Sequence, residues 1–138
     1  MPKTRLDPAD FARNPDRYRH GAFDHERLDV FAVARSALEQ GEAIANKLPP
    51  YRANLAEQLN RALLSAYLGV VETAAQTGPP RVTAARAARA SAAQAAAALE
   101  LIEHYELAAV DAIASATHLL GRLSAMLTRL SQRTSLPR

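Results

Sequence analysis

Hydrophobic and polar positions repeat at the period of an α-helix along most of this sequence, most clearly between Leu55 and Thr73. The expected core face of this segment consists of Leu55, Leu59, Ala62, Leu63, Ala66, Val70 and Ala74. A second apolar arc lies beside it and consists of Leu64, Tyr67, Leu68 and Val71. A surface helix of a monomer needs an apolar stripe of roughly 100°, and this segment is apolar over about twice that width. We therefore predict that the second arc is an oligomer interface.

The same periodicity places a helix on either side of a proline pair. The earlier helix begins near Asp24 and ends before Pro49, because neither Pro49 nor Pro50 can donate to a helical ladder. Its expected core residues are Phe31, Ala34, Leu38, Gly41, Ala45 and Leu48. The helix with two apolar arcs then starts around Arg52 and ends before Gly78, where a glycine followed by prolines is a typical stop signal.

Two more helices are predicted after Gly78. The first begins by Val82 and is almost entirely alanine between Ala84 and Ala98, with an outward face of Arg86, Arg89, Ala93, Ala96, Glu100 and Glu103. Alanine has the highest helix propensity, and its small side chain lets neighbouring helices approach closely. A tight turn around residues 104–107 leads to a last helix that runs to about Gln132. Its expected core residues are Ala112, Leu119, Leu123, Met126, Leu127 and Leu130.

Four helices joined by short turns predict an all-α fold, an up-down-up-down antiparallel four-helix bundle over residues 24–133. No alternating pattern indicates a strand. Residues 1–23 are expected to form a flexible basic arm, in which a short helical turn could start at Asp7 with Pro8 at its first position. Residues 134–138 form a basic tail. We expect one domain, and the two apolar arcs favour a homo-oligomer.

The charge distribution changes the picture more than the formal net charge of +3 does. No acidic residue follows Asp111, and all but two of the 17 basic residues are arginines, which suit bidentate phosphate contacts. At the helical period, the stripe on the last helix and the arginines on its neighbours form a candidate nucleic-acid-binding set: Arg61, Arg86, Arg89, His118, Arg122, Arg129 and Arg133. The alternative is a solvated bundle face. Because the tyrosines are expected mostly in the core, binding would depend on shape and charge.

Several kinds of chemistry are missing from the sequence. There is no cysteine, and the four histidines are not spaced as metal ligands. No glutamate is followed three residues later by histidine, the pattern of di-iron bundles, and there is no phosphate-binding glycine loop. We therefore expect neither enzymatic activity nor a cofactor. No apolar run is long enough to span a bilayer and no signal peptide is visible, so a cytoplasmic location is expected.

Four segments resemble a known family: FDHERLDVFAVA, LPPYRANLAEQLNRALLSAYLGVVET, ARASAAQAAAALE and LLGRLSAMLTRL. The family is the group of small four-helix-bundle proteins that includes those encoded in intervening sequences of bacterial large-subunit ribosomal RNA genes, and the accessory variability determinant of diversity-generating retroelements. The resemblance implies a ring, commonly a homopentamer, and, in the retroelement members, contacts with nucleic acid and a reverse transcriptase. The family's Asn-Ile-Ala-Glu-Gly corresponds here to residues 69–73, where Glu72 alone matches. Ser65, Glu72, Ser91 and Gln94 are left as a candidate interhelical polar set.

Two functional hypotheses follow. The first is a non-catalytic, ring-forming bundle that binds structured RNA, or a partner that handles nucleic acid, through its basic faces. The second is a protein–protein assembly or adaptor module in which the arginines only increase solubility.

Overall fold

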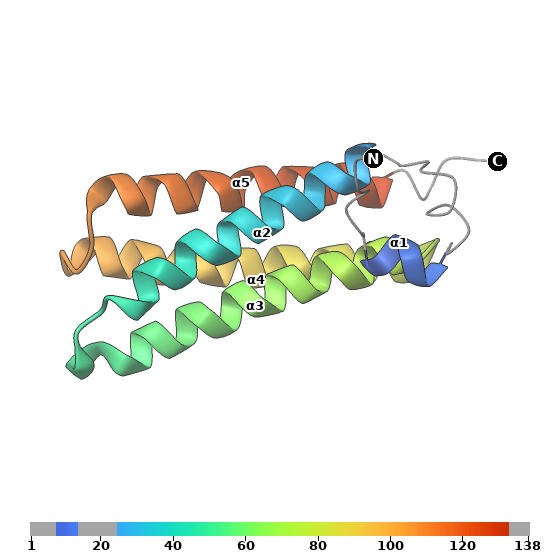
Figure 1. Cartoon of the computed structure of the whole chain (residues 1–138). Coiled ribbons are helices and arrows are strands. Elements are labelled where there is room, and N and C mark those ends of the chain that lie inside the picture. Colours follow the sequence, from blue (N-terminus) through green and yellow to red (C-terminus); the bar gives the residue numbers. More distant parts are fainter. Residues whose placement is uncertain (1–7, 14–24, 133–138) are drawn as a thin grey trace.

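The structure is a computed structural model that describes residues 8–13 and 25–132, and all secondary structure in these ranges is helical (Figure 1). Four long helices form the body: α2 (His25–Asn46), α3 (Ala53–Ala75), α4 (Pro79–His104) and α5 (Val110–Gln132). A short helix α1 (Pro8–Arg13) precedes them, and a single 3-10 turn, η2 (Pro50–Arg52), lies between α2 and α3. Asp24, Arg133 and the 134–138 tail lie outside the described residues.

The long helices run alternately in opposite directions, which confirms the predicted bundle of four helices (Figure 1). Each packs against its two neighbours in the order α2, α3, α4, α5 and back to α2. The helix α1 packs against α3, and its Ala9 is buried in the same hydrophobic core, within the segment that we predicted as an arm.

The helix ends follow the predicted stop signals. α4 begins at Pro79, within the predicted limit of Val82, because prolines fit the first positions of a helix, where no backbone donor is needed. Gly78 precedes it with a φ of 65°, a value that favours glycine. The turn after α4 has neither glycine nor proline and is closed by backbone hydrogen bonds from Leu107 N to Ile102 O (3.0 Å) and from Glu106 N to Glu103 O (2.9 Å).

Most of the predicted core face of α3 is buried, with Leu59 and Val70 fully enclosed, while Leu55 is half-buried and Thr73 joins the core. On α2 the buried face is wider than predicted, because α2 packs against both α3 and α5, and it also includes Val30, Val33, Ala37 and Ile44. The predicted core arc of α5 is partly wrong. Ala112 is exposed. The buried residues of α5 include Ile113, Ala116 and Leu120, which lie one position further round the helix.

The alanine-rich helix α4 lies very close to α3. Ala85, Ala88, Ala92 and Ala95 are buried, and Gly69 of α3 faces Ala88 directly. A Cβ atom added to Gly69 would lie 2.7 Å from the Cβ and 3.1 Å from the Cα of Ala88. The small residues therefore allow the two backbones to approach, as the composition predicts.

Replacing Gly69 by Ala is expected to lower the free energy of unfolding by about 1 to 3 kcal/mol, because the α4 backbone cannot move aside easily. This loss exceeds the gain in helix propensity of about 1 kcal/mol. The matched control is Gly121→Ala on the exposed side of α5, where nothing lies within 4 Å of the new atom. The control should stabilise the protein. Urea unfolding of both variants at one protein concentration tests the contrast, and equal effects would contradict it.

Arg81, in the first turn of α4, fastens the end of α3 to the start of α4. Its side chain is 8% exposed, and its Nε donates to the carbonyl oxygens of Thr73 (3.2 Å) and Gln76 (2.8 Å). These carbonyls belong to the last turn and the C-cap of α3, where the helix dipole favours a cation. A charged residue is thus part of the packed structure at this junction.

Candidate interaction surfaces

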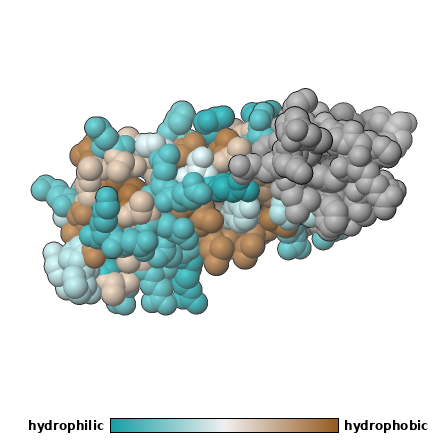
Figure 2. Space-filling model, in the orientation of Figure 1, coloured by the Kyte–Doolittle hydropathy of each residue, from teal (hydrophilic) through white to brown (hydrophobic). Residues whose placement is uncertain are grey.

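The second apolar arc of α3 is divided by the structure into an exposed and a packed pair. Leu64 is 49% exposed and Leu68 is 54% exposed. Tyr67 and Val71 are half-buried against the core, and the Tyr67 ring meets Phe31 of α2 edge-on at 6.4 Å between centroids. Figure 2 shows a hydrophobic patch near the middle of the lower edge, beside a mostly hydrophilic stretch, in the region where Figure 1 draws α3. Of the predicted interface, Leu64 and Leu68 are the two residues that solvent reaches most freely.

We use the name α3 face for Leu64 and Leu68 together with the two charged residues at their edge, Arg61 and Glu72. Both charged side chains are exposed, and neither makes an ion pair within the described part of the chain. On the α4 side of this face, the hydroxyl groups of Ser65 and Ser91 are 2.8 Å apart and hydrogen-bonded. Of the four residues expected to join α3 to α4, Ser65 and Ser91 therefore meet, while Glu72 and Gln94 are exposed.

The predicted basic residues do not form one continuous patch. On α5, Arg129 lies beside Asp29 and Val30 of α2. His118 and Arg122 share its stripe at the helical period, and all three are exposed.

The remaining arginines lie on other sides of the bundle. Arg89 reaches across the α4–α5 groove and donates from Nη1 to Thr128 Oγ1 at 3.2 Å, while Arg86 is exposed on the same helix. Arg61 lies one turn before Ser65, on the side of α3 next to α4. The six described members thus occupy three sides of the bundle, and Arg133 lies outside the described residues.

The expectation that the tyrosines are mostly core residues is wrong for two of them. Tyr51 is 78% exposed and Tyr105 is 44% exposed, both at the bundle end that holds η2 and the α4–α5 turn. Between them lies Arg52, whose guanidinium carbon is 3.9 Å from the Tyr105 ring centroid and 5.8 Å from that of Tyr51. His104 meets Tyr105 edge-on at 5.1 Å. A tyrosine next to a proline pair was the available signal for this cluster.

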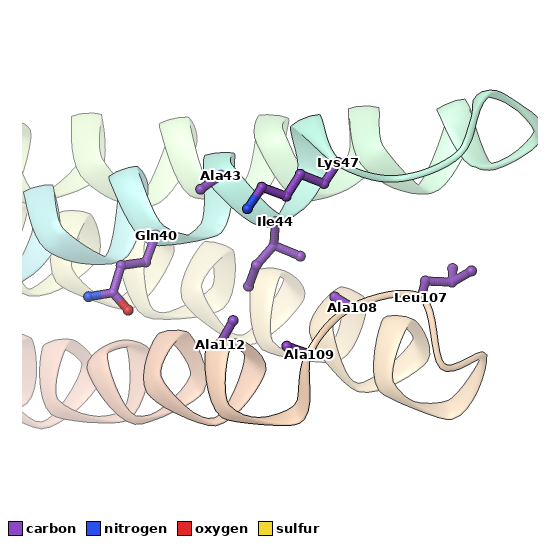
Figure 3. A pocket seen from close by; sticks show the side chains of 8 residues that line it. All are labelled: Gln40, Ala43, Ile44, Lys47, Leu107, Ala108, Ala109 and Ala112. Atoms are coloured by element: carbon purple, nitrogen blue, oxygen red, sulfur yellow. The ribbon is translucent and has the colours of Figure 1, made fainter.

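A small apolar cavity of about 290 Å³ lies at the same end, between α2 and the start of α5 (Figure 3). It is lined by Gln40, Ala43, Ile44, Lys47, Leu107, Ala108, Ala109 and Ala112. Ser115 donates to Gln40 Oε1 at 2.7 Å, which ties α5 to α2 beside the cavity. Among its lining residues, Lys47 is the one with a charge.

Within residues 8–13 and 25–132, no group of three or more histidine, aspartate or glutamate side chains is placed to hold a metal ion. Over the same residues, none of the helices combines the length and hydropathy that crossing a membrane requires.

Neither a scan against protein-family models nor a search of curated proteins gives a match to this chain.

Proposed function

We propose that this protein is a non-catalytic helical bundle that associates with itself through the α3 face and binds structured RNA through its exposed arginines. The observation that supports RNA binding is a set of exposed arginine side chains without ion-pair partners in the described part of the chain. Arg61, Arg86, Arg122 and Arg129 make no ion pair within the described part of the chain. Guanidinium groups that are not neutralised by carboxylates are available for phosphate oxygens.

The distribution of these arginines favours a large partner. Because they lie on three sides of the bundle, a single compact anion cannot reach them together. A folded RNA is large enough to contact arginines on several sides of one bundle. In an oligomer, the arginines of several copies would also lie side by side and could contact one RNA. In such a complex the affinity depends mainly on phosphate contacts and falls steeply with salt.

Charge reversal on α5 tests RNA binding. Arg122→Glu and Arg129→Glu combined are expected to reduce the slope of log K against log salt by about 2, because each lost phosphate contact removes about one unit. The measurement is fluorescence anisotropy of a labelled RNA hairpin between low and physiological salt. The single variants Arg122→Glu and Arg129→Glu have Lys47→Glu as their matched control. This substitution makes the same charge change at the other end of the α2–α5 pair.

If the wild-type protein shows no salt-dependent RNA binding, the arginine proposal fails. If Lys47→Glu weakens binding as much as Arg122→Glu, net charge and not the α5 stripe is responsible.

The second candidate function is a protein assembly or adaptor module, and the exposure of Leu64 and Leu68 favours it. Two adjacent leucines at about half exposure on one helix are a hydrophobic surface that a partner could cover. In this case a pull-down would return a protein partner whether or not the lysate was treated with nuclease. The loss of that partner after nuclease treatment would favour RNA binding.

For both candidate functions, the way in which copies contact each other determines the number of copies in the assembly. A ring, which the family resemblance implies, would join the α3 face of each copy to a different surface of the next copy. A self-complementary α3 face would join two copies instead. Light scattering at micromolar concentration distinguishes five copies, two copies and one.

A further inference from the structure

We infer that the α3 face is self-complementary and pairs two copies of this chain about a two-fold axis, with the α3 helices antiparallel. In this pairing Leu64 packs against Leu68 of the other copy, and Arg61 lies opposite Glu72 of the other copy. The inference deepens the proposed self-association and rests on it, but it does not depend on RNA binding.

The first argument is the exposed pair of leucines. Leu64 and Leu68 are one helical turn apart and remain about half exposed although α1 packs against the same helix. In an isolated copy this area stays in contact with water, and covering it with another apolar side chain is favourable. The half-buried Val71 continues the apolar strip along α3.

The second argument is the register. Leu64 and Leu68 lie two positions before and after Ala66. Arg61 and Glu72 lie five positions before and six positions after the same residue. When two identical helices cross antiparallel about a two-fold axis near this point, residues equidistant from it face each other. The midpoint of the leucine pair is position 66 and that of the charged pair is position 66.5, a difference of about 0.75 Å along the helix, so one register brings leucine near leucine and arginine near glutamate.

The third argument is that both charges lie on the same flank of the leucines. At 100° per residue, Arg61 and Glu72 differ by only about 20° around α3, on the side next to Ser65. A two-fold axis perpendicular to the helices keeps that flank on the same side in both copies, so each arginine meets a glutamate. Along one helix the two residues are about 16 Å apart, which is too far for an ion pair within a copy.

The occupant is therefore a second copy of this chain. An unrelated partner would need apolar groups opposite the leucines, and also an acidic group opposite Arg61 and a basic group opposite Glu72. A second copy supplies all of these in one register. A two-fold contact uses the same patch twice, and this patch has the required symmetry in both its apolar and its charged positions.

The test is a charge exchange measured by sedimentation equilibrium. Arg61→Glu and Glu72→Arg, each alone, place like charges opposite each other twice in every pair and should weaken the dimer by at least about tenfold. The double variant R61E/E72R keeps the net charge of the wild type and should restore the dissociation constant to within about threefold. Circular dichroism of each variant checks that the bundle is folded.

Mixing the two single variants provides the sharpest control. In a pair of identical variant chains, both contacts place like charges opposite each other. In a pair with one chain of each variant, both contacts again join opposite charges. The mixture should therefore dimerise when neither component does. A heterologous ring contact predicts no such recovery.

The outcomes separate this inference from the proposed function. A wild-type protein that stays monomeric overturns self-association as a whole, together with this pairing. Self-association stands but the two-fold register is overturned in two cases. In the first, the wild type is an oligomer and the single exchanges leave its dissociation constant unchanged. In the second, the single exchanges weaken the dimer but neither the double variant nor mixing restores it. RNA binding is measured separately by anisotropy.

Discussion

Replacing the buried Arg81 by Met is expected to lower the free energy of unfolding by about 2 to 3 kcal/mol. The Nε group of Arg81 donates to two carbonyl oxygens at the end of α3, and a hydrogen bond that involves a charged group contributes about 1.5 to 3 kcal/mol. Met fills a similar volume, so the change isolates the polar contacts from the packing. The measurement is urea unfolding followed by circular dichroism at a fixed protein concentration.

Arg86→Met is the matched control, because Arg86 lies on the same helix but is exposed. Its effect should stay within about 0.5 kcal/mol, as for most surface substitutions. Arg81→Lys should give an intermediate loss, since a lysine keeps the charge but lacks the Nε donor of the guanidinium group. If Arg81→Met unfolds at the same urea concentration as the wild type, the junction between α3 and α4 is held by packing alone.

Helix positions are the part of the fold that periodicity and proline chemistry predict well. Pro49 and Pro50 end α2, and the apolar period of α3 identifies most of its buried residues. The rotation of a helix with several apolar sides is harder to predict. On α5, leucines and alanines occupy more than one arc, and the arc that becomes buried is decided by contacts with α2 and α4, which lie far away in the sequence.

The role of Arg81 was not visible in the sequence. An arginine after two prolines is typical of an exposed helix start, and its burial depends on the carbonyl groups at the end of another helix. The turn after α4 illustrates the same limit. Glu106 adopts a φ of 56°, a conformation in which glycine is usual, because the surrounding backbone hydrogen bonds close the turn around it.

The candidate surfaces were only partly predictable for a geometric reason. A period places residues on one side of their own helix, as for His118, Arg122 and Arg129, but does not say which sides of different helices meet. The Arg89–Thr128 contact places Arg89 in the α4–α5 groove, whereas Arg129 lies toward α2. Likewise, the second arc of α3 was visible as a pattern, but the packing of Tyr67 against Phe31 follows from the position of α2.

The assembly and the RNA proposal are connected through Arg61. In the inferred pair, Arg61 lies opposite a glutamate and is partly neutralised, so it contributes less to phosphate binding than Arg122 does. The pairing also brings two bundles together and doubles the arginines that one RNA can contact. Dimer and RNA affinity should therefore rise together when salt is lowered, with Arg61 contributing to the dimer and Arg122 to RNA binding.

Replacing both Leu64 and Leu68 by Arg should convert the oligomer to a monomer, raising the dissociation constant by more than about 100-fold, or about 2.7 kcal/mol. The change removes apolar contact from both halves of the interface and places cations where no carboxylate faces them. Since both side chains are about half exposed, the bundle itself should keep its helicity. Light scattering and circular dichroism of the same samples measure the two effects together.

The matched control is Val110→Arg on α5, which changes a residue that is 62% exposed and lies outside the α3 face. It should leave the mass of the assembly unchanged. If the double leucine variant unfolds instead, then Leu64 and Leu68 support the core and the division of α3 into two arcs is wrong. If it stays folded and assembled, the copies meet through another surface. A folded monomer, with Val110→Arg still assembled, is the combination that assigns the contact to α3.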